Sequence, residues 1–154
     1  MADDTILSRI QTDMTAAMKS REAATLSTLR MLKTALMEAR TRKPRDASLT
    51  ADEEIEVLQR YAKKRREAIE EFRKLGRDDL VASEEKEIAV TAAYLPQGLG
   101  DDELRALIRE AIAATGAAGP KDTGKVIGAV MAKAKGRVEG GTVSRLVKEA
   151  LAGA

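Results

Sequence analysis

Apolar residues recur every three or four positions along almost the whole chain, and this spacing restricts the fold more than any other feature. Near the N-terminus, Ile6, Ile10, Met14 and Met18 follow one another at steps of four. Such steps place side chains on one face of an α-helix. Alanine, glutamate, lysine, leucine and arginine supply 84 of the 154 residues, a bias typical of long helices. No segment alternates like a β-strand, so the sequence predicts an all-α protein.

The same spacing predicts seven helices, near residues 4–19, 23–42, 51–75, 77–94, 101–115, 120–135 and 140–152. Thr50 with Glu53 reads as a capping box, and Pro120 suits a first helical position. Glycines at 76, 116 and 136 follow the ends of predicted helices. The third helix is long enough either to protrude from a small domain or to pair with another helix as a helical hairpin.

Glycine is distributed unevenly, because only Gly76 of the eleven glycines precedes Pro96. Pro96 disfavours helical geometry at the residue before it, and two further glycines follow within four residues. We therefore expect a junction here. The predicted architecture is an N-terminal four-helix domain with a long helical hairpin (residues 1–96), followed by a small three-helix C-terminal domain (residues 97–154).

Histidine and cysteine are both absent, which excludes Cys/His zinc sites, iron–sulfur clusters, cysteine nucleophiles, Ser-His-Asp triads and disulfides. Ser83 and Lys86 match the S-x-x-K motif of penicillin-binding enzymes, but the companion S-D-N and K-T-G motifs are missing. We expect no catalytic residues, no cofactor and no metal in this chain.

Residues 119–125 match the start of a phosphate-binding P-loop, but the match then fails. Val126 stands where a P-loop needs Ser or Thr to hold magnesium, and no strand is predicted before the loop. A structural interpretation is a helix start followed by the small residues Gly124, Gly128 and Ala132, a stripe that would let another backbone approach closely. An anion-facing helix N-terminus is the other interpretation.

Two basic clusters could contact nucleic acid. In the third predicted helix, residues 63–66 read Lys-Lys-Arg-Arg, but glutamates three and four residues away are expected to turn most of this run into a salt-bridged surface. From residue 116 onward, seven basic residues face three acidic ones, a net charge of +4 in a chain whose total is only +2. These seven candidate phosphate contacts are Lys121, Lys125, Lys133, Lys135, Arg137, Arg145 and Lys148.

The spacing of Lys121, Lys125 and Lys133 predicts one shared helical face. No aromatic residue occurs after Tyr94, so base stacking is not available there, and recognition would rest on shape and phosphates. The alternative is an ordinary solvated surface.

Several segments together resemble the GatB/YqeY family of small bacterial proteins. They are residues 29–33 (LRMLK), 85–88 (EKEI) leading to 94–96 (YLP), 124–128 (GKVIG) and 133–137 (KAKGR). The resemblance implies a helical domain followed by a small domain like the tail of the B subunit of the tRNA-dependent amidotransferase, which is implicated in gripping tRNA. It implies no catalytic residues in this chain.

The expected function is that of a non-catalytic accessory protein whose basic C-terminal face binds tRNA or a tRNA-processing enzyme. The alternatives are a component that contributes to amide transfer by a carbon–nitrogen ligase, and a purely structural protein-interaction module. The N-terminus is acidic and no apolar run approaches the length of a membrane span, so we expect a cytoplasmic protein without a membrane partner.

Overall fold

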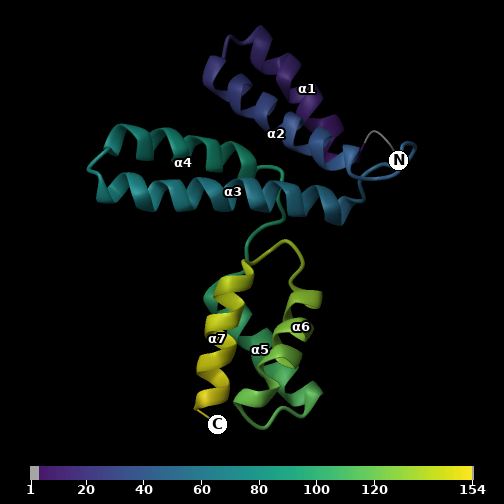
Figure 1. Cartoon of the computed structure of the whole chain (residues 1–154), viewed down its shortest axis with the longest axis vertical. Coiled ribbons are helices and arrows are strands. Elements are labelled where there is room, and N and C mark those ends of the chain that lie inside the picture. The colour runs from purple at the N-terminus through teal and green to yellow at the C-terminus, as the bar shows by residue number, and fades with distance from the viewer. Residues whose placement is uncertain (1–3, 154) are drawn as a thin grey trace. The chain divides into compact units, whose positions relative to one another are not determined.

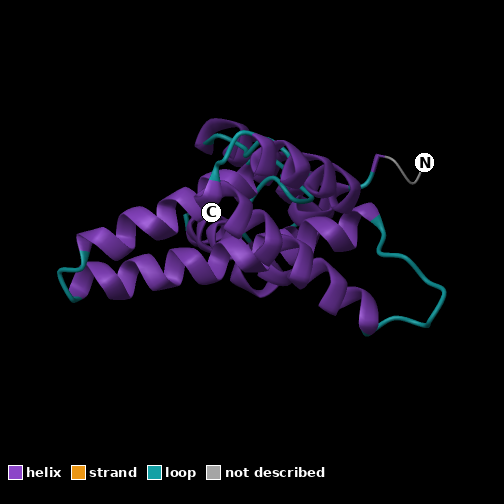
Figure 2. Ribbon diagram, turned by 90° about the horizontal axis from the view of Figure 1, so that it is seen from above, coloured by secondary structure: helices purple, strands orange, loops and turns teal. Residues whose placement is uncertain are grey.

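The computed structural model describes residues 4–153 as helices joined by loops (Figure 1, Figure 2). The helices are α1 (Ile6–Lys19), α2 (Ala23–Thr41), α3 (Ala51–Lys74), α4 (Asp78–Ala92), α5 (Asp101–Thr115), α6 (Thr123–Lys133) and α7 (Gly140–Ala152), with a short 3-10 turn, η2 (Pro120–Asp122), before α6. Residues 4–153 contain no strand. The all-α prediction is confirmed.

The chain divides into two compact units between Leu95 and Pro96. The N-terminal unit contains α1 to α4, and the C-terminal unit contains α5 to α7. Each unit has its own cluster of buried apolar side chains. The division into two independently folding domains, residues 1–96 and 97–154, stays a prediction.

In the N-terminal unit, α1 packs against α2, and α3 packs against α4 (Figure 1). The long third helix therefore pairs as a helical hairpin. Leucines of α2 and α3 form the centre of the core, where Leu32, Leu36 and Leu58 are fully buried. Met18, which the spacing assigned to an apolar helix face, is 52% exposed, so the buried face of α1 is narrower than predicted.

The start of α3 also caps the N-terminal end of α1 through hydrogen bonds from Glu54. The predicted capping box is present. The Glu53 amide donates to Thr50 Oγ1 and the Thr50 amide donates to Glu53 Oε1, each at a distance of 3.1 Å. The next residue, Glu54, is only 3% exposed. Its carboxylate accepts from the amides of Ile6 and Leu7, at 3.2 and 2.9 Å, and so satisfies two donors that begin a helix elsewhere in the sequence.

The core of the C-terminal unit is built from aliphatic side chains of α5, α6 and α7, with Leu104, Ile108, Val126 and Val130 among its most buried members. Gly116 ends α5 in the left-handed conformation, with φ of 67°, as its position in the sequence predicted. The helix predicted from Pro120 begins only at Thr123. The Asp122 carboxylate accepts from the Ala118 amide at 3.0 Å, which closes a tight 3-10 turn in front of α6.

The stripe of small residues on α6 was expected to lie against another backbone, but it is exposed. Gly124, Gly128 and Ala132 are all exposed. A Cβ atom added at either glycine would meet no heavy atom within 4 Å in the described part of the chain. No described backbone approaches this face, and the glycines therefore serve no close packing within residues 4–153.

Both tyrosines are buried beside carboxylates, which predicts an unusual alkaline titration. Burial raises the pKa of Tyr61, and its hydrogen bond to Glu87 raises it further. Burial likewise raises the pKa of Tyr94, whose hydroxyl donates to Asp13. An unfolded tyrosine ionises near pH 10. The folded state thus holds these protons more tightly, so the stability they contribute is present below about pH 10 and is lost as pH rises toward the folded pKa values.

We expect no tyrosinate absorbance near pH 10 while the helical signal is native, and its appearance only with alkaline unfolding. The chain has two tyrosines and no tryptophan, so the signal is easily assigned. The same protein in denaturant should ionise near pH 10 and serves as the control. A native-state tyrosine that ionised there would contradict the burial and hydrogen bonding described above.

Candidate nucleic-acid interface

The seven basic residues predicted as phosphate contacts are all exposed, and they come from four consecutive segments. Lys121 lies in η2, Lys125 and Lys133 in α6, Lys135 and Arg137 in the turn after α6, and Arg145 and Lys148 in α7. The helical spacing that predicted one face applies only from Thr123 onward, because Lys121 lies in the 3-10 turn. Lys121 is therefore placed by the turn and not by the α6 helix.

Lys121 and Lys125 flank Asp122 at the start of α6. The amide of Ala118 holds the pKa of the Asp122 carboxyl below its usual range, and the two lysines lower it further. Neither lysine forms an ion pair within 4 Å among the described residues. The P-loop interpretation fails here for a structural reason as well, since the chain's own carboxylate occupies the Ala118 donor and the preceding element is the helix α5.

Two of the seven residues reach α5, Lys133 near Glu110 and Arg137 at 3.6 Å from Glu103, and their roles differ. Lys133 lies 3.8 Å from Glu110, but both side chains are more than half exposed, so the pair holds the lysine only weakly. Arg137 is fixed in place, because its Nε donates to the Gln97 carbonyl and its own carbonyl accepts from the Leu99 amide, each at a distance of 2.9 Å. Arg137 thus fastens residues 97–99 to the turn after α6 and is in part a positioning residue.

On α7, Arg145 pairs with Glu149 at 3.3 Å within the same helix, whereas Lys148 has no ion pair among the described residues. Glu149 also lines a hollow of about 220 Å³ between α5 and α7, together with Arg105 and Arg109. These two exposed arginines were missed by the sequence reasoning. Their spacing of four on a predicted helix was the available signal, but they lie before residue 116, where the count of basic residues began.

The basic run of α3 is arranged differently from the prediction. Arg65 pairs with Glu84 and Glu87 of α4, at 3.6 and 3.8 Å, and stacks over the Tyr61 ring at 4.8 Å. Its partners therefore come from across the hairpin and not from its own helix, because its position on the helix turns it toward α4. Burial raises the pKa of Glu84, which Arg65 opposes. Lys63 and Lys64 are exposed.

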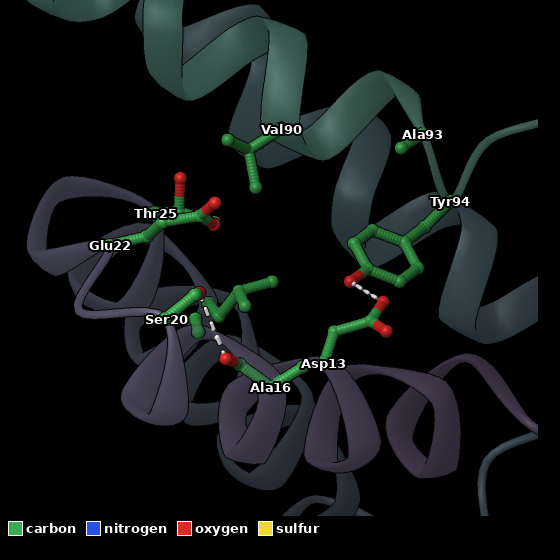
Figure 3. Close-up of a pocket in the computed structure, with 10 residues that line it drawn as sticks. Asp13, Ala16, Ser20, Glu22, Thr25, Val90, Ala93 and Tyr94 are labelled. Atoms are coloured by element: carbon green, nitrogen blue, oxygen red, sulfur yellow. Dashed lines mark hydrogen bonds between the residues drawn. The ribbon is translucent and has the colours of Figure 1, made fainter.

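The N-terminal unit also contains a hollow of about 420 Å³ between the α1–α2 turn region and the end of α4 (Figure 3). Figure 3 shows the Tyr94 hydroxyl directed at the Asp13 carboxylate, with Glu22 on another side of the hollow. Two carboxylates and no basic side chain line this space, so it disfavours phosphate.

Other kinds of site find little support among the described residues. Ser83 and Lys86 are both exposed on α4, as expected for a solvated surface. No group of three or more metal-ligating side chains was found within residues 4–153. No helix in this range is long and apolar enough to cross a membrane.

Comparison with known proteins gives one family and two relatives. Residues 7–151 match the family described as "Yqey-like protein". Altered inheritance of mitochondria protein 41 from Pyrenophora tritici-repentis is 31% identical over 152 residues, which cover 96% of this chain and 81% of that protein. An uncharacterised protein from Schizosaccharomyces pombe is 37% identical over 82 residues, which cover 53% of this chain and 64% of that protein.

Proposed function

The chain belongs to the YqeY-like (GatB/YqeY) family, and from this premise we propose that it is a non-catalytic accessory protein that binds tRNA through its C-terminal unit. One observation carries the proposal: residues 116–154 have a net charge of +4, and every basic side chain among them is exposed. The proposed contacts are Lys121, Lys125, Lys133, Lys135, Arg137, Arg145 and Lys148.

The contacts fall into three groups on this proposal. Lys121, Lys125 and Lys148 are exposed and carry no ion pair among the described residues, so they are available to an external phosphate. Lys133 and Arg145 must give up weak surface pairs, which costs little in water. Arg137 contributes charge while keeping residues 97–99 attached to its turn. No aromatic residue lies in this unit, so the interface follows the phosphate backbone.

The proposed place of action is the cytoplasm. The name of the Pyrenophora relative refers to mitochondria, and mitochondria are therefore the alternative compartment to test.

A partner that processes tRNA, including one that performs amide transfer as a carbon–nitrogen ligase, fits the same basic surface. A pull-down from lysate with identification of RNA and protein separates direct tRNA binding from recruitment by such an enzyme and from a purely structural interaction.

The proposal predicts a definite salt dependence. Each phosphate neutralised by a lysine or arginine releases condensed counterions, so affinity for tRNA should fall as salt rises. With 3–5 contacts and roughly 0.7–0.9 ions released per contact, the slope of log K against log salt should be about −2 to −4.5. The measurement is a titration of labelled tRNA at several salt concentrations. A double reversal, Lys125→Glu with Lys133→Glu, should flatten the slope and weaken all tRNAs similarly.

The matched control is Lys63→Glu with Lys64→Glu, which changes the net charge equally on α3. It should have the smaller effect, because Glu67 lies three and four residues from these lysines on α3 and is expected to offset their charge. Equal losses in the two double variants would move the site to the long helix. An absence of tRNA binding at low salt would overturn the proposal and leave protein interaction as the better explanation.

A further inference from the structure

A further concentration of positive charge lies in the N-terminal unit, along the second half of α2 and the start of the loop after it. Residues 30–45 contain six basic residues and one acidic residue, a net charge of +5. That exceeds the +4 of residues 116–154, which extend over more than twice the length. Residues 1–95 as a whole are neutral, so this charge is concentrated locally.

The structure gathers part of this charge around an open hollow. α2 ends at Thr41, Arg42 caps it, and the chain then turns at Pro44. The loop that follows leads to α3 and forms the teal connection at the right of Figure 2. The hollow has a volume of about 480 Å³, and its lining residues are Met37, Arg40, Thr41, Lys43 and Arg45.

Three cations line this hollow, and Arg42 lies between them in the sequence, but the four are not equally available. Lys43 is already engaged, because its Nζ donates to the Ser48 carbonyl at 2.9 Å and to Glu53 Oε1 at 2.5 Å. The side chains of Arg40, Arg42 and Arg45 are exposed and form neither a hydrogen bond nor an ion pair with any residue among 4–153. Three guanidinium groups are thus left to interact with something outside the chain.

Helix-dipole compensation explains only part of this arrangement. Cations in the last turn of a helix interact favourably with its C-terminal carbonyls, and this accounts for Arg40 and Arg42. Arg45 lies beyond the helix, on the far side of Pro44, where the dipole no longer acts. Its inclusion in the lining of the same hollow as Arg40 therefore needs a different explanation.

We propose that Arg40, Arg42 and Arg45 form a second phosphate-contact surface, by which the N-terminal unit binds the backbone of an RNA. The inference rests on the proposed function, because it assigns a further part of the chain to the same RNA. Guanidinium groups match phosphate oxygens in bidentate geometry, which suits a ligand with repeated phosphates. No aromatic side chain lies within residues 30–45, so the surface follows the backbone and does not stack on bases.

The test is a triple neutralisation, Arg40→Gln, Arg42→Gln and Arg45→Gln, in the full chain. The matched control is Lys63→Gln, Lys64→Gln and Lys86→Gln, which removes the same charge from exposed positions on the hairpin of the same unit. We expect the arginine variant to bind labelled tRNA about tenfold or more weakly at 0.1 M salt, with a salt slope shallower by roughly 2. Thermal unfolding should change little, because the three side chains have no partners among residues 4–153.

Each outcome has a clear meaning. An unchanged tRNA affinity in the arginine variant, together with a loss in Lys125→Glu/Lys133→Glu, overturns this inference and leaves the proposed function intact. Equal losses in the arginine variant and its control overturn it as a mere effect of net charge. Polyglutamate serves as a second probe, and a loss confined to polyglutamate would assign the surface to an acidic protein. A wild-type chain that does not bind tRNA overturns both proposals.

Discussion

Leu104→Ala is expected to unfold the C-terminal unit at moderate temperature while the N-terminal unit stays folded. Leu104 is only 1% exposed and belongs to the core formed by α5, α6 and α7. Truncating a buried leucine to alanine costs about 2–5 kcal/mol. A domain the size of residues 96–154 typically has a free energy of unfolding of about 3–9 kcal/mol, so the loss removes a large share of it.

The measurement is thermal unfolding followed by circular dichroism, with proteolysis to identify the part that opens. The expected result is a first transition in which only residues after about Pro96 become cleavable. Leu107→Ala is the matched control, because Leu107 lies on the same helix but is only half-buried and is not a member of the core. If Leu104→Ala melted the whole chain in a single transition, the two units would be one cooperative domain and the predicted domain division would be wrong.

Glu54→Ala is expected to destabilise the N-terminal unit by about 2–4 kcal/mol, since it leaves the amides of Ile6 and Leu7 without their carboxylate acceptor. Hydrogen bonds to a charged group contribute more than neutral ones, and a buried donor without an acceptor carries the full cost of desolvation. The effect should exceed that of an ordinary N-cap loss, because one side chain serves two donors across 47 and 48 positions of sequence.

Chemical denaturation of the variant, followed by its helical signal, measures this loss. Glu56→Ala is the control on the same helix, because Glu56 is exposed and approaches Arg60 only at 4.0 Å. Its substitution should change stability by no more than about 0.5 kcal/mol. Glu54→Gln should fall between the two, because the amide keeps one acceptor oxygen. Equal stabilities for the two alanine variants would show that Glu54 does not hold the start of α1.

Local signals in the sequence were sufficient for most of the fold. The capping box at Thr50 and the left-handed glycine at 116 act within a few residues, so their sequence patterns identify them directly. The turn between α1 and α2 shows the limit of this approach. Arg21 has a φ of 57° there, a left-handed conformation that favours glycine. Because the residue is an arginine, its identity does not predict this conformation.

The candidate site was harder to predict because it depends on which charges meet in space. Arg65 counted as part of a surface run in sequence, yet its partners lie on α4. Lys121 is offset from the α6 helix by a 3-10 turn, which the contact between Asp122 and the Ala118 amide helps to close. The charge of residues 30–45 is visible in the sequence. Only the structure distinguishes the engaged Lys43 from Arg40, Arg42 and Arg45, whose side chains have no partner within the described range 4–153.

The exposed glycines of α6 link binding to folding. α6 has 11 residues and glycine at 124 and 128, so its intrinsic tendency to be helical is weak. Val126 and Val130, which are fully buried, hold it against α5 and α7. The geometry of Lys125 and Lys133 therefore exists only while that core is intact. A polyanion that binds this geometry must in turn raise the stability of the core. The gain is about 2.7 kcal/mol at a polyanion concentration of 100 times Kd. The C-terminal unit is therefore most stable when such a polyanion is bound.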